Sequence, residues 1–169
     1  MSKIIRSQVR RYSKNLKNFR NVCKDTDDNI ITHEDYEYNC MGYALGTYTW
    51  EILKDFQEWA WWHENEDKET FIADMLCICI DEILARFSNL REIKYISDAL
   101  PTERVIAMRI GADDFHFARL GSDGIWTHKP GNQAIQEMTE DELFDNMWCE
   151  HRCYPYTSDI IFFAIKERN

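Results

Sequence analysis

The sequence predicts one α+β domain in which helices precede antiparallel strands. A length of 169 residues is enough for one compact core and short for two. Apolar residues recur at helical spacings of three and four up to about residue 87. After Pro101, short segments rich in β-branched and aromatic residues follow, as expected for strands. Helices followed by antiparallel strands are typical of the α+β class.

Residues 1–24 are predicted to form a basic amphipathic helix. They contain eight Lys or Arg residues and no acidic residue, whereas the rest of the chain carries 12 basic and 30 acidic side chains. The apolar residues that share one helical face are Ile5, Val9, Tyr12, Leu16 and Phe19. Two interpretations stay open: the helix docks on the acidic body of residues 25–169, or it attaches to a membrane surface or nucleic acid.

A second helix is predicted to begin at Asn39. Residues 24–35 are polar and are expected to form a loop. Asparagine is favoured at the N-cap position, and apolar residues then recur at helical spacing through Phe56. Cys40 would therefore lie in the first helical turn. A further helix is expected over residues 70–87.

The second half of the chain is predicted to supply the sheet. Four strands are expected, over residues 104–110, 114–120, 125–129 and 159–166. A short helix is expected over residues 139–147, where Thr139 and Glu142 suit a capping box. No internal repeat or low-complexity segment divides this part of the chain, so residues 25–169 are expected to form a single domain.

The turn between the second and third strands controls where two histidines point. Ser122–Gly124 suits a three-residue connection with Gly124 in the left-handed conformation, which makes a bulge. In that register Ala118 faces His128, and His116 lies diagonally beside His128 on the same face of the sheet. A two-residue turn would put the two histidines on opposite faces. The prediction of a histidine pair therefore depends on the bulge.

Cys40 is the candidate nucleophile. Backbone N–H groups at a helix start stabilise a thiolate, and they can also receive a developing oxyanion. A nucleophilic cysteine needs a base within hydrogen-bond reach and a third group that fixes the tautomer of the base. Cys40, His116 and His128 have the residue types of such a triad, with His116 as the base and His128 as its orienting partner.

The stretch Asn-Cys-Met-Gly-Tyr at residues 39–43 resembles the Asp-Cys-Ser-Gly-aromatic motif of NlpC-type peptidases, a branch of the papain-like superfamily. In that family the nucleophile starts a helix packed on an antiparallel sheet, and two polar residues on neighbouring strands, often both histidine, complete the site. The spacing from His116 to His128 is similar to the family spacing, and the resemblance covers roughly residues 36–130. It implies a papain-like fold and a thiol hydrolase acting on an amide or isopeptide bond of a peptide or protein.

A second resemblance is closer in sequence. The motifs Asn-Cys…Tyr-Ala-Leu and Trp-Thr-His-Lys-Pro-Gly are similar to those of a group of uncharacterised bacterial and phage domains. Those domains imply no particular substrate.

Four residues near the candidate triad are candidates for supporting roles. Tyr36 and Tyr38 precede the nucleophile and could donate to an oxyanion, or could pack in the core or at the surface. Asn39 is a candidate for orienting the site as well as for the N-cap, and Asn132 is a reserve candidate for orienting His116.

Composition limits the compartment and the partners. The six cysteines are expected to be reduced, because no secretory signal is recognised at the N-terminus, and a cytoplasmic location follows. No apolar run is long enough to span a membrane. The net charge of −10 makes nucleic-acid binding by the body of the chain an unfavourable hypothesis. No cofactor is expected, and the oligomeric state is left open.

Two other functions remain as alternatives. The first is a non-enzymatic acidic interaction or inhibitor protein on a papain-like scaffold, for example a phage or bacterial counter-defence protein, because a scaffold can outlive its chemistry. The second is a zinc-binding protein. Cys40, His116 and His128 are also a plausible set of three zinc ligands, and Cys149, His151 and Cys153 add further ligand types.

Overall fold

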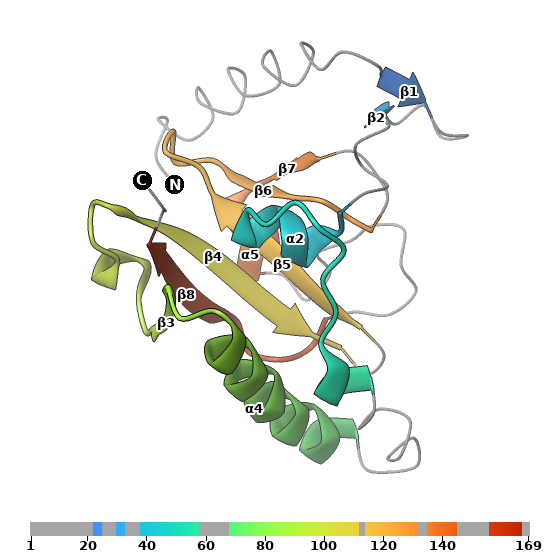
Figure 1. Ribbon diagram of the computed structural model, residues 1–169, viewed down its shortest axis with the longest axis vertical. Coiled ribbons are helices and arrows are strands. Elements are labelled where there is room, and N and C mark those ends of the chain that lie inside the picture. The colour runs from blue at the N-terminus through green and yellow to red at the C-terminus, as the bar shows by residue number, and fades with distance from the viewer. Residues whose placement is uncertain are drawn as a thin grey trace.

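A six-stranded antiparallel sheet forms the centre of the structure (Figure 1). This computed structural model describes residues 22–24, 30–32, 38–57, 68–111, 114–131, 135–144 and 156–166. The strand order is β3-β8-β4-β5-β6-β7, and every neighbouring pair is antiparallel. The strands are β3 (Leu90–Ile93), β4 (Glu103–Ile110), β5 (Phe115–Leu120), β6 (Trp126–His128), β7 (Gln136–Met138) and β8 (Ile161–Lys166). The predicted α+β class is confirmed.

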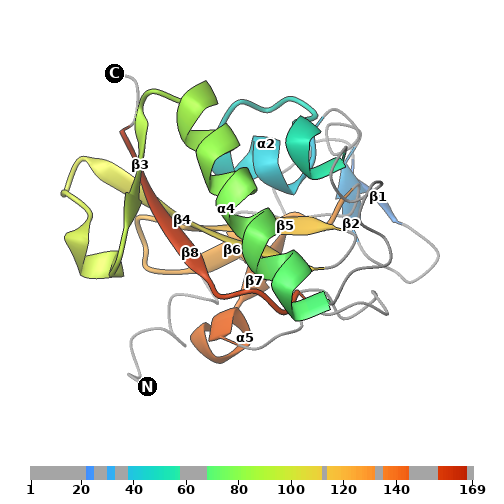
Figure 2. The ribbon, with the colours of Figure 1, turned by 90° about the horizontal axis from the view of Figure 1, so that it is seen from below.

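Helices lie on both faces of this sheet. They are α2 (Cys40–Leu45), α4 (Lys68–Arg86) and α5 (Glu140–Phe144). Figure 2 shows α2 and α4 on one side of the sheet and α5 on the other. We call these two sides the α2/α4 face and the α5 face. No helix within the described residues is both long enough and apolar enough to cross a membrane.

Each face of the sheet has its own buried cluster. On the α2/α4 face, Met41 of α2 packs with Phe117 of β5 and Phe163 of β8. On the α5 face, Leu143 packs with small and large residues of the strands, Ala118 and Trp126 among them. Since side chains alternate along a strand, successive residues of β5 belong to opposite clusters.

The first long helix expected from the sequence is shorter than predicted. Helix α2 ends at Leu45, because Gly46 adopts the left-handed conformation (φ 72°) and its N–H closes the helix end. Residues 54–57 form a separate helical turn. The apolar spacing that suggested one continuous helix to Phe56 therefore arises from a helix, a loop and a second short helix. The later helix was predicted correctly, and α4 covers it.

The strands near the N-terminus were not predicted. The sequence suggested a helix over residues 1–24, most of which lies outside the described residues, but Val22–Lys24 form the strand β1 and not a helix. This strand pairs with β2 (Ile30–Thr32), which lies in the segment expected to be a loop. The β-branched residues of Ile-Ile-Thr favour a strand over the polar context around them. Strands β3 and β7 were also not predicted.

The hairpin of β5 and β6 has the predicted register. Ala118 is opposite His128, and Leu120 is opposite Trp126. Gly124 has a φ of 79°, and the N–H of Gly121 donates to the carbonyl of Ile125 at 2.8 Å. The bulged turn is therefore confirmed, and with it the placement of both histidines on one face.

Candidate active site

Asn39 begins α2 and also holds the loop that follows the helix. Its Oδ1 accepts from the N–H of Gly42 at 3.1 Å, which confirms the predicted N-cap. The same oxygen accepts from the N–H of Glu51 at 3.3 Å, and Nδ2 donates to the Glu51 carbonyl at 2.6 Å. These contacts make Asn39 a structural clamp, and its amide is directed at the loop.

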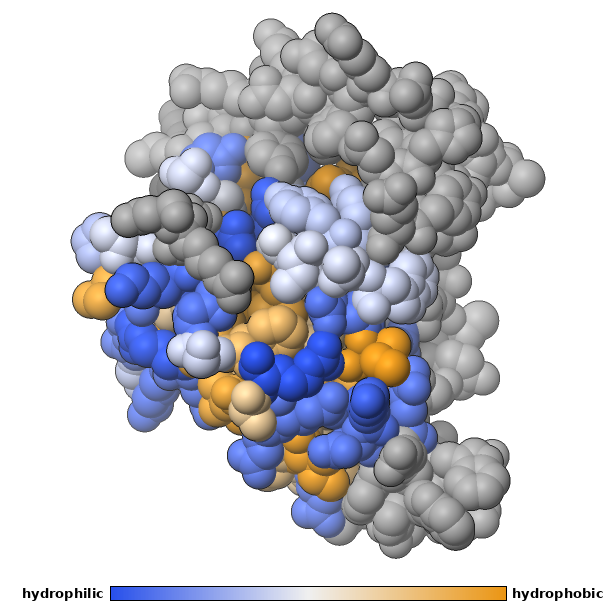
Figure 3. All heavy atoms as spheres, viewed as in Figure 1, coloured by the Kyte–Doolittle hydropathy of each residue, from blue (hydrophilic) through white to orange (hydrophobic). Residues whose placement is uncertain are grey.

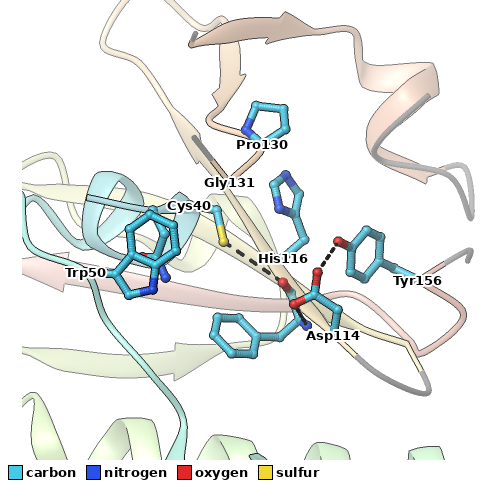
Figure 4. A pocket seen from close by; sticks show the side chains of 9 residues that line it. Cys40, Trp50, Asp114, His116, Pro130, Gly131 and Tyr156 are labelled. Carbon is cyan, nitrogen blue, oxygen red and sulfur yellow. Dashed lines mark hydrogen bonds between the residues drawn. The ribbon is translucent and has the colours of Figure 1, made fainter. Parts of the chain in front are cut away.

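Cys40 lies on the α2/α4 face of the sheet. Its side chain is 5% exposed and belongs to the cluster that contains Phe115 and Phe117. The thiol donates to the backbone carbonyl of Phe115, with 4.0 Å between sulfur and oxygen (Figure 4). This sulfur-to-carbonyl distance is at the long end for a hydrogen bond, so the contact orients the thiol only weakly.

His116 and His128 form a direct pair on the α5 face. Nε2 of His116 and Nδ1 of His128 are 2.8 Å apart, and both side chains are buried. The His116 ring also stacks on Tyr156, with ring centroids 5.4 Å apart and planes 28° from parallel. His116 is thus held between an imidazole and a phenol ring, which fixes its orientation.

Burial determines the charge of His128. Removal from water lowers the pKa of His128 from its usual value of 6.5 to about 4, so His128 is neutral at pH 7. Nδ1 of a neutral His128 can accept a hydrogen bond from the N–H group that His116 carries at Nε2. In that tautomer the lone pair of His116 is on Nδ1, and this nitrogen is the one that can act as a base.

Cys40 and His116 border the same small pocket at the start of β5 (Figure 4). The pocket has a volume of about 80 Å³, and the residues lining it are Asn39, Cys40, Trp50, Asp114, Phe115, His116, Pro130, Gly131 and Tyr156. The two candidate catalytic side chains reach it from opposite faces of the sheet, because Phe115 and His116 are adjacent on one strand. The two histidines are in direct contact, whereas the Cys40 thiol lies on the other face of strand β5.

Several residues of the pocket were not identified from the sequence, among them Trp50 and the hydrogen-bonded pair of Asp114 and Tyr156. The hydroxyl of Tyr156 donates to Oδ2 of Asp114 at 2.9 Å, and Oδ1 of Asp114 accepts from the N–H of Phe115 at 2.9 Å. Asp114 is marked in the sequence only by its position as the first residue of a predicted strand. Tyr156 carries no local signal, because it reaches the pocket through packing of a distant segment.

The remaining supporting candidates have other positions. Tyr38 is buried, packs edge-to-face against Tyr48 with centroids 5.4 Å apart, and does not line the pocket. Nζ of Lys129 lies 5.1 Å from the centroid of the Tyr38 ring and donates to the carbonyl of Gly131 at 2.7 Å. This contact joins the segment before Cys40 to the rim of the pocket. Tyr36 and Asn132 lie outside the described residues.

The zinc alternative gains no support from the described part of the chain. There, no group of three or more His, Cys, Asp or Glu side chains is placed to hold a metal ion. Cys40 and the histidine pair are therefore not a ligand set in this structure. Cys149, His151 and Cys153 lie outside the described residues.

Two features define the candidate site. The contacts that matter are the thiol of Cys40 beside the start of β5 and the His116–His128 pair at the same pocket. No family model, curated protein or solved structure matches the chain.

Proposed function

We propose that the protein is a papain-like thiol hydrolase that cleaves an amide or isopeptide bond of a peptide or protein substrate. The observation that carries the proposal is the pocket shared by Cys40 and His116, with His116 bonded to the neutral His128. A nucleophile, a base and a group that orients the base are the three parts that this chemistry needs. The resemblance of residues 39–43 to the NlpC-type motif supports the same class.

The first half of the reaction forms a thioester. Nδ1 of His116 takes the thiol proton, and the thiolate of Cys40 attacks the substrate carbonyl carbon. The oxyanion that develops is stabilised by backbone N–H groups at the start of α2. The carbon–nitrogen bond then breaks, and the His116 imidazolium gives its proton to the leaving amine. His128 accepts from Nε2 of His116 throughout and keeps the ring in place.

The second half restores the enzyme. A water molecule loses a proton to His116 and attacks the thioester carbonyl. The carbon–sulfur bond breaks, the product leaves as a carboxylic acid, and the proton on His116 returns to the sulfur of Cys40. One water is consumed for each amide bond cleaved.

This mechanism sets one structural requirement. The thiol now donates to the carbonyl of Phe115, so the Cys40 side chain has to turn from that carbonyl to His116 across the pocket. Catalytic hydrogen bonds are often long before substrate binds. Substrate that enters the pocket would displace the thiol from the Phe115 carbonyl.

The test is the reactivity of individual cysteines in the native protein. An ordinary thiol is only about 0.3% ionised at pH 6, so labelling by iodoacetamide at this pH selects an activated thiol. We expect Cys40 to label at least about tenfold faster than the exposed Cys77, measured per cysteine by mass spectrometry. His116→Ala should remove most of that advantage. Cys79, whose pKa burial raises to about 12, is an internal control that should stay unlabelled.

A second candidate function is an acidic interaction protein without catalysis. The specific observation in its favour is that Cys40 is 5% exposed and lies on the α2/α4 face, opposite the histidine pair. On this hypothesis the burial that holds the thiol in the core makes Cys40 label more slowly than Cys77. His116→Ala would then leave the Cys40 rate unchanged, and that result would remove the hydrolase proposal.

A further inference from the structure

The loop of residues 46–51, directly after α2, is held in one conformation by a central carboxylate. Oε1 of Glu51 accepts from the hydroxyls of Thr47 at 2.9 Å and Thr49 at 2.7 Å. Oε2 of Glu51 pairs with the guanidinium of Arg86 on α4 at 2.5 Å. Asn39 adds hydrogen bonds to both the N–H and the carbonyl of Glu51. Asn39, which bonds to the backbone of this loop, is also the residue immediately before Cys40 in the chain.

This fixed loop presents aromatic side chains to the outside. Trp50 and Tyr48 are each 53% exposed, although large aromatic rings are favoured in protein interiors. Tyr48 also has a φ of 52°, a conformation that is costly for a residue with a side chain. On the face of the molecule that carries α2, hydrophobic side chains appear in separate patches between hydrophilic ones (Figure 3). A rigid, strained loop that exposes rings is typical of a binding element.

Trp50 lines the pocket that Cys40 and His116 share. Its indole lies beside the Cys40 side chain at the rim of the pocket (Figure 4). Within the described part of the chain, no hydrogen bond, ion pair or ring contact engages this indole. Pro130 and Tyr156 also line the pocket, and the Tyr156 ring is buried and stacked on His116. A flat apolar group entering the pocket would thus find the exposed indole of Trp50 beside the Cys40 side chain.

We propose that Trp50 is a specificity-determining residue that stacks against an aromatic side chain of the substrate next to the bond under attack. The proposal rests on the proposed hydrolase function, because it places Trp50 relative to the thiol of Cys40. Asp114, an acidic residue of the same pocket, already accepts hydrogen bonds from Tyr156 and from the Phe115 N–H. The exposed aromatic surface of the rim is the Trp50 indole, and an aromatic group on the substrate is its chemical match.

Covalent probes test this without knowledge of the natural substrate. In each probe a thiolate displaces chloride from a chloroacetamide, so that a carbon–sulfur bond forms and chloride leaves. N-benzyl-2-chloroacetamide carries a phenyl ring that is separated by three atoms from the reacting carbon, and N-methyl-2-chloroacetamide has no ring. We expect the benzyl probe to label Cys40 about fivefold faster than the methyl probe, as stacking of one ring supports. The ratio of the two rates corrects for any change in the reactivity of the thiol itself.

Two variants of Trp50 test whether this residue causes the faster labelling by the benzyl probe. Trp50→Ala should bring the ratio of benzyl to methyl rates close to one, and Trp50→Phe should retain part of it. Tyr95→Ala removes an aromatic side chain that is 57% exposed and does not line the pocket, so this control should keep the wild-type ratio. Far-ultraviolet circular dichroism of each variant confirms that the protein is folded.

The outcomes separate this inference from the proposed function. If Cys40 shows activated labelling with iodoacetamide but no benzyl preference, Trp50 is not a specificity residue and the hydrolase proposal stands. The same conclusion follows if Tyr95→Ala lowers the ratio as much as Trp50→Ala. If Cys40 is not activated at all, the hydrolase proposal fails and this inference fails with it.

Discussion

His128 is a buried imidazole that forms a hydrogen bond with a second imidazole. Because burial keeps its pKa near 4, protonating it in the folded state is costly. Its partner His116 is 2% exposed, so the pair as a whole is shielded from water. In the proposed mechanism His128 acts through His116 and does not touch the substrate.

The lowered pKa of His128 predicts a stability that depends on pH. The unfolded chain has the ordinary pKa of 6.5, so between pH 6.5 and about 4 it binds a proton that the folded chain does not. The contribution of neutral His128 to the free energy of unfolding is therefore present above pH 6.5 and is lost as the pH falls toward 4. The loss amounts to about 3 kcal/mol in all. Urea unfolding of wild type and His128→Asn at pH 7.5 and 4.5 measures it.

Comparing wild type with His128→Asn separates the contribution of His128 from that of the other titrating groups. Wild type should lose more free energy of unfolding than His128→Asn over the same pH interval. Equal losses would mean that His128 has an ordinary pKa in the folded protein.

At the scale of elements, α2 and the loop after it approach each other closely. A Cβ atom on Gly42 would lie 1.9 Å from the backbone carbonyl oxygen of Thr49, a distance that no side-chain adjustment relieves. The loop of residues 46–51 is therefore packed against the helix that begins with Cys40. This contact links the candidate nucleophile to the exposed Trp50.

Gly42→Ala should accordingly destabilise the protein by about 3 kcal/mol or more, since backbone atoms would have to move. Gly131→Ala is the matched control. A Cβ at Gly131 meets nothing within 4 Å, and its cost of about 1 kcal/mol would come from the left-handed φ of 53° alone. Chemical denaturation of the two variants provides the comparison. Equal losses in the two variants would contradict the close packing of α2 on this loop.

The sequence predicted the start of α2 better than its end. The start depends on one local hydrogen bond from the Asn39 side chain, which a single residue type indicates. The end depends on Gly46 and on a loop held by Glu51, Arg86 and Asn39, which are far apart in the chain. Apolar periodicity alone could not distinguish a longer helix from a helix followed by a loop.

At the scale of the whole molecule, the last of the described strands is an internal strand of the sheet. Strand β8 lies between β3 and β4, so the sheet is completed by the end of the chain. Phe163 of β8 is fully buried and packs in the same cluster as Cys40 and Met41. The position of α2 and its thiol therefore depends on a strand more than 100 residues away in sequence.

Phe163→Ala should lower the free energy of unfolding by about 3–5 kcal/mol, the usual cost of emptying a buried aromatic site. Phe144→Ala removes the same side chain where it is 57% exposed, and should change the stability by about 0.5 kcal/mol or less. Thermal and urea unfolding of both variants make the measurement. A small effect of Phe163→Ala would mean that β8 is not part of the cooperative core.

The sequence by itself determined the features that depend on local rules: the helix start at Asn39, the bulged turn at Gly124, and the pairing of His116 with His128. Tertiary structure alone decided that α2 packs on the face opposite this pair, and that Tyr156 and Trp50 join the pocket. The physical reason is that alternation along a strand shows which residues share a face. Alternation does not show which face of the sheet a distant helix covers. The hydrophobic effect is non-directional, so a helix gains from burying apolar surface on either face.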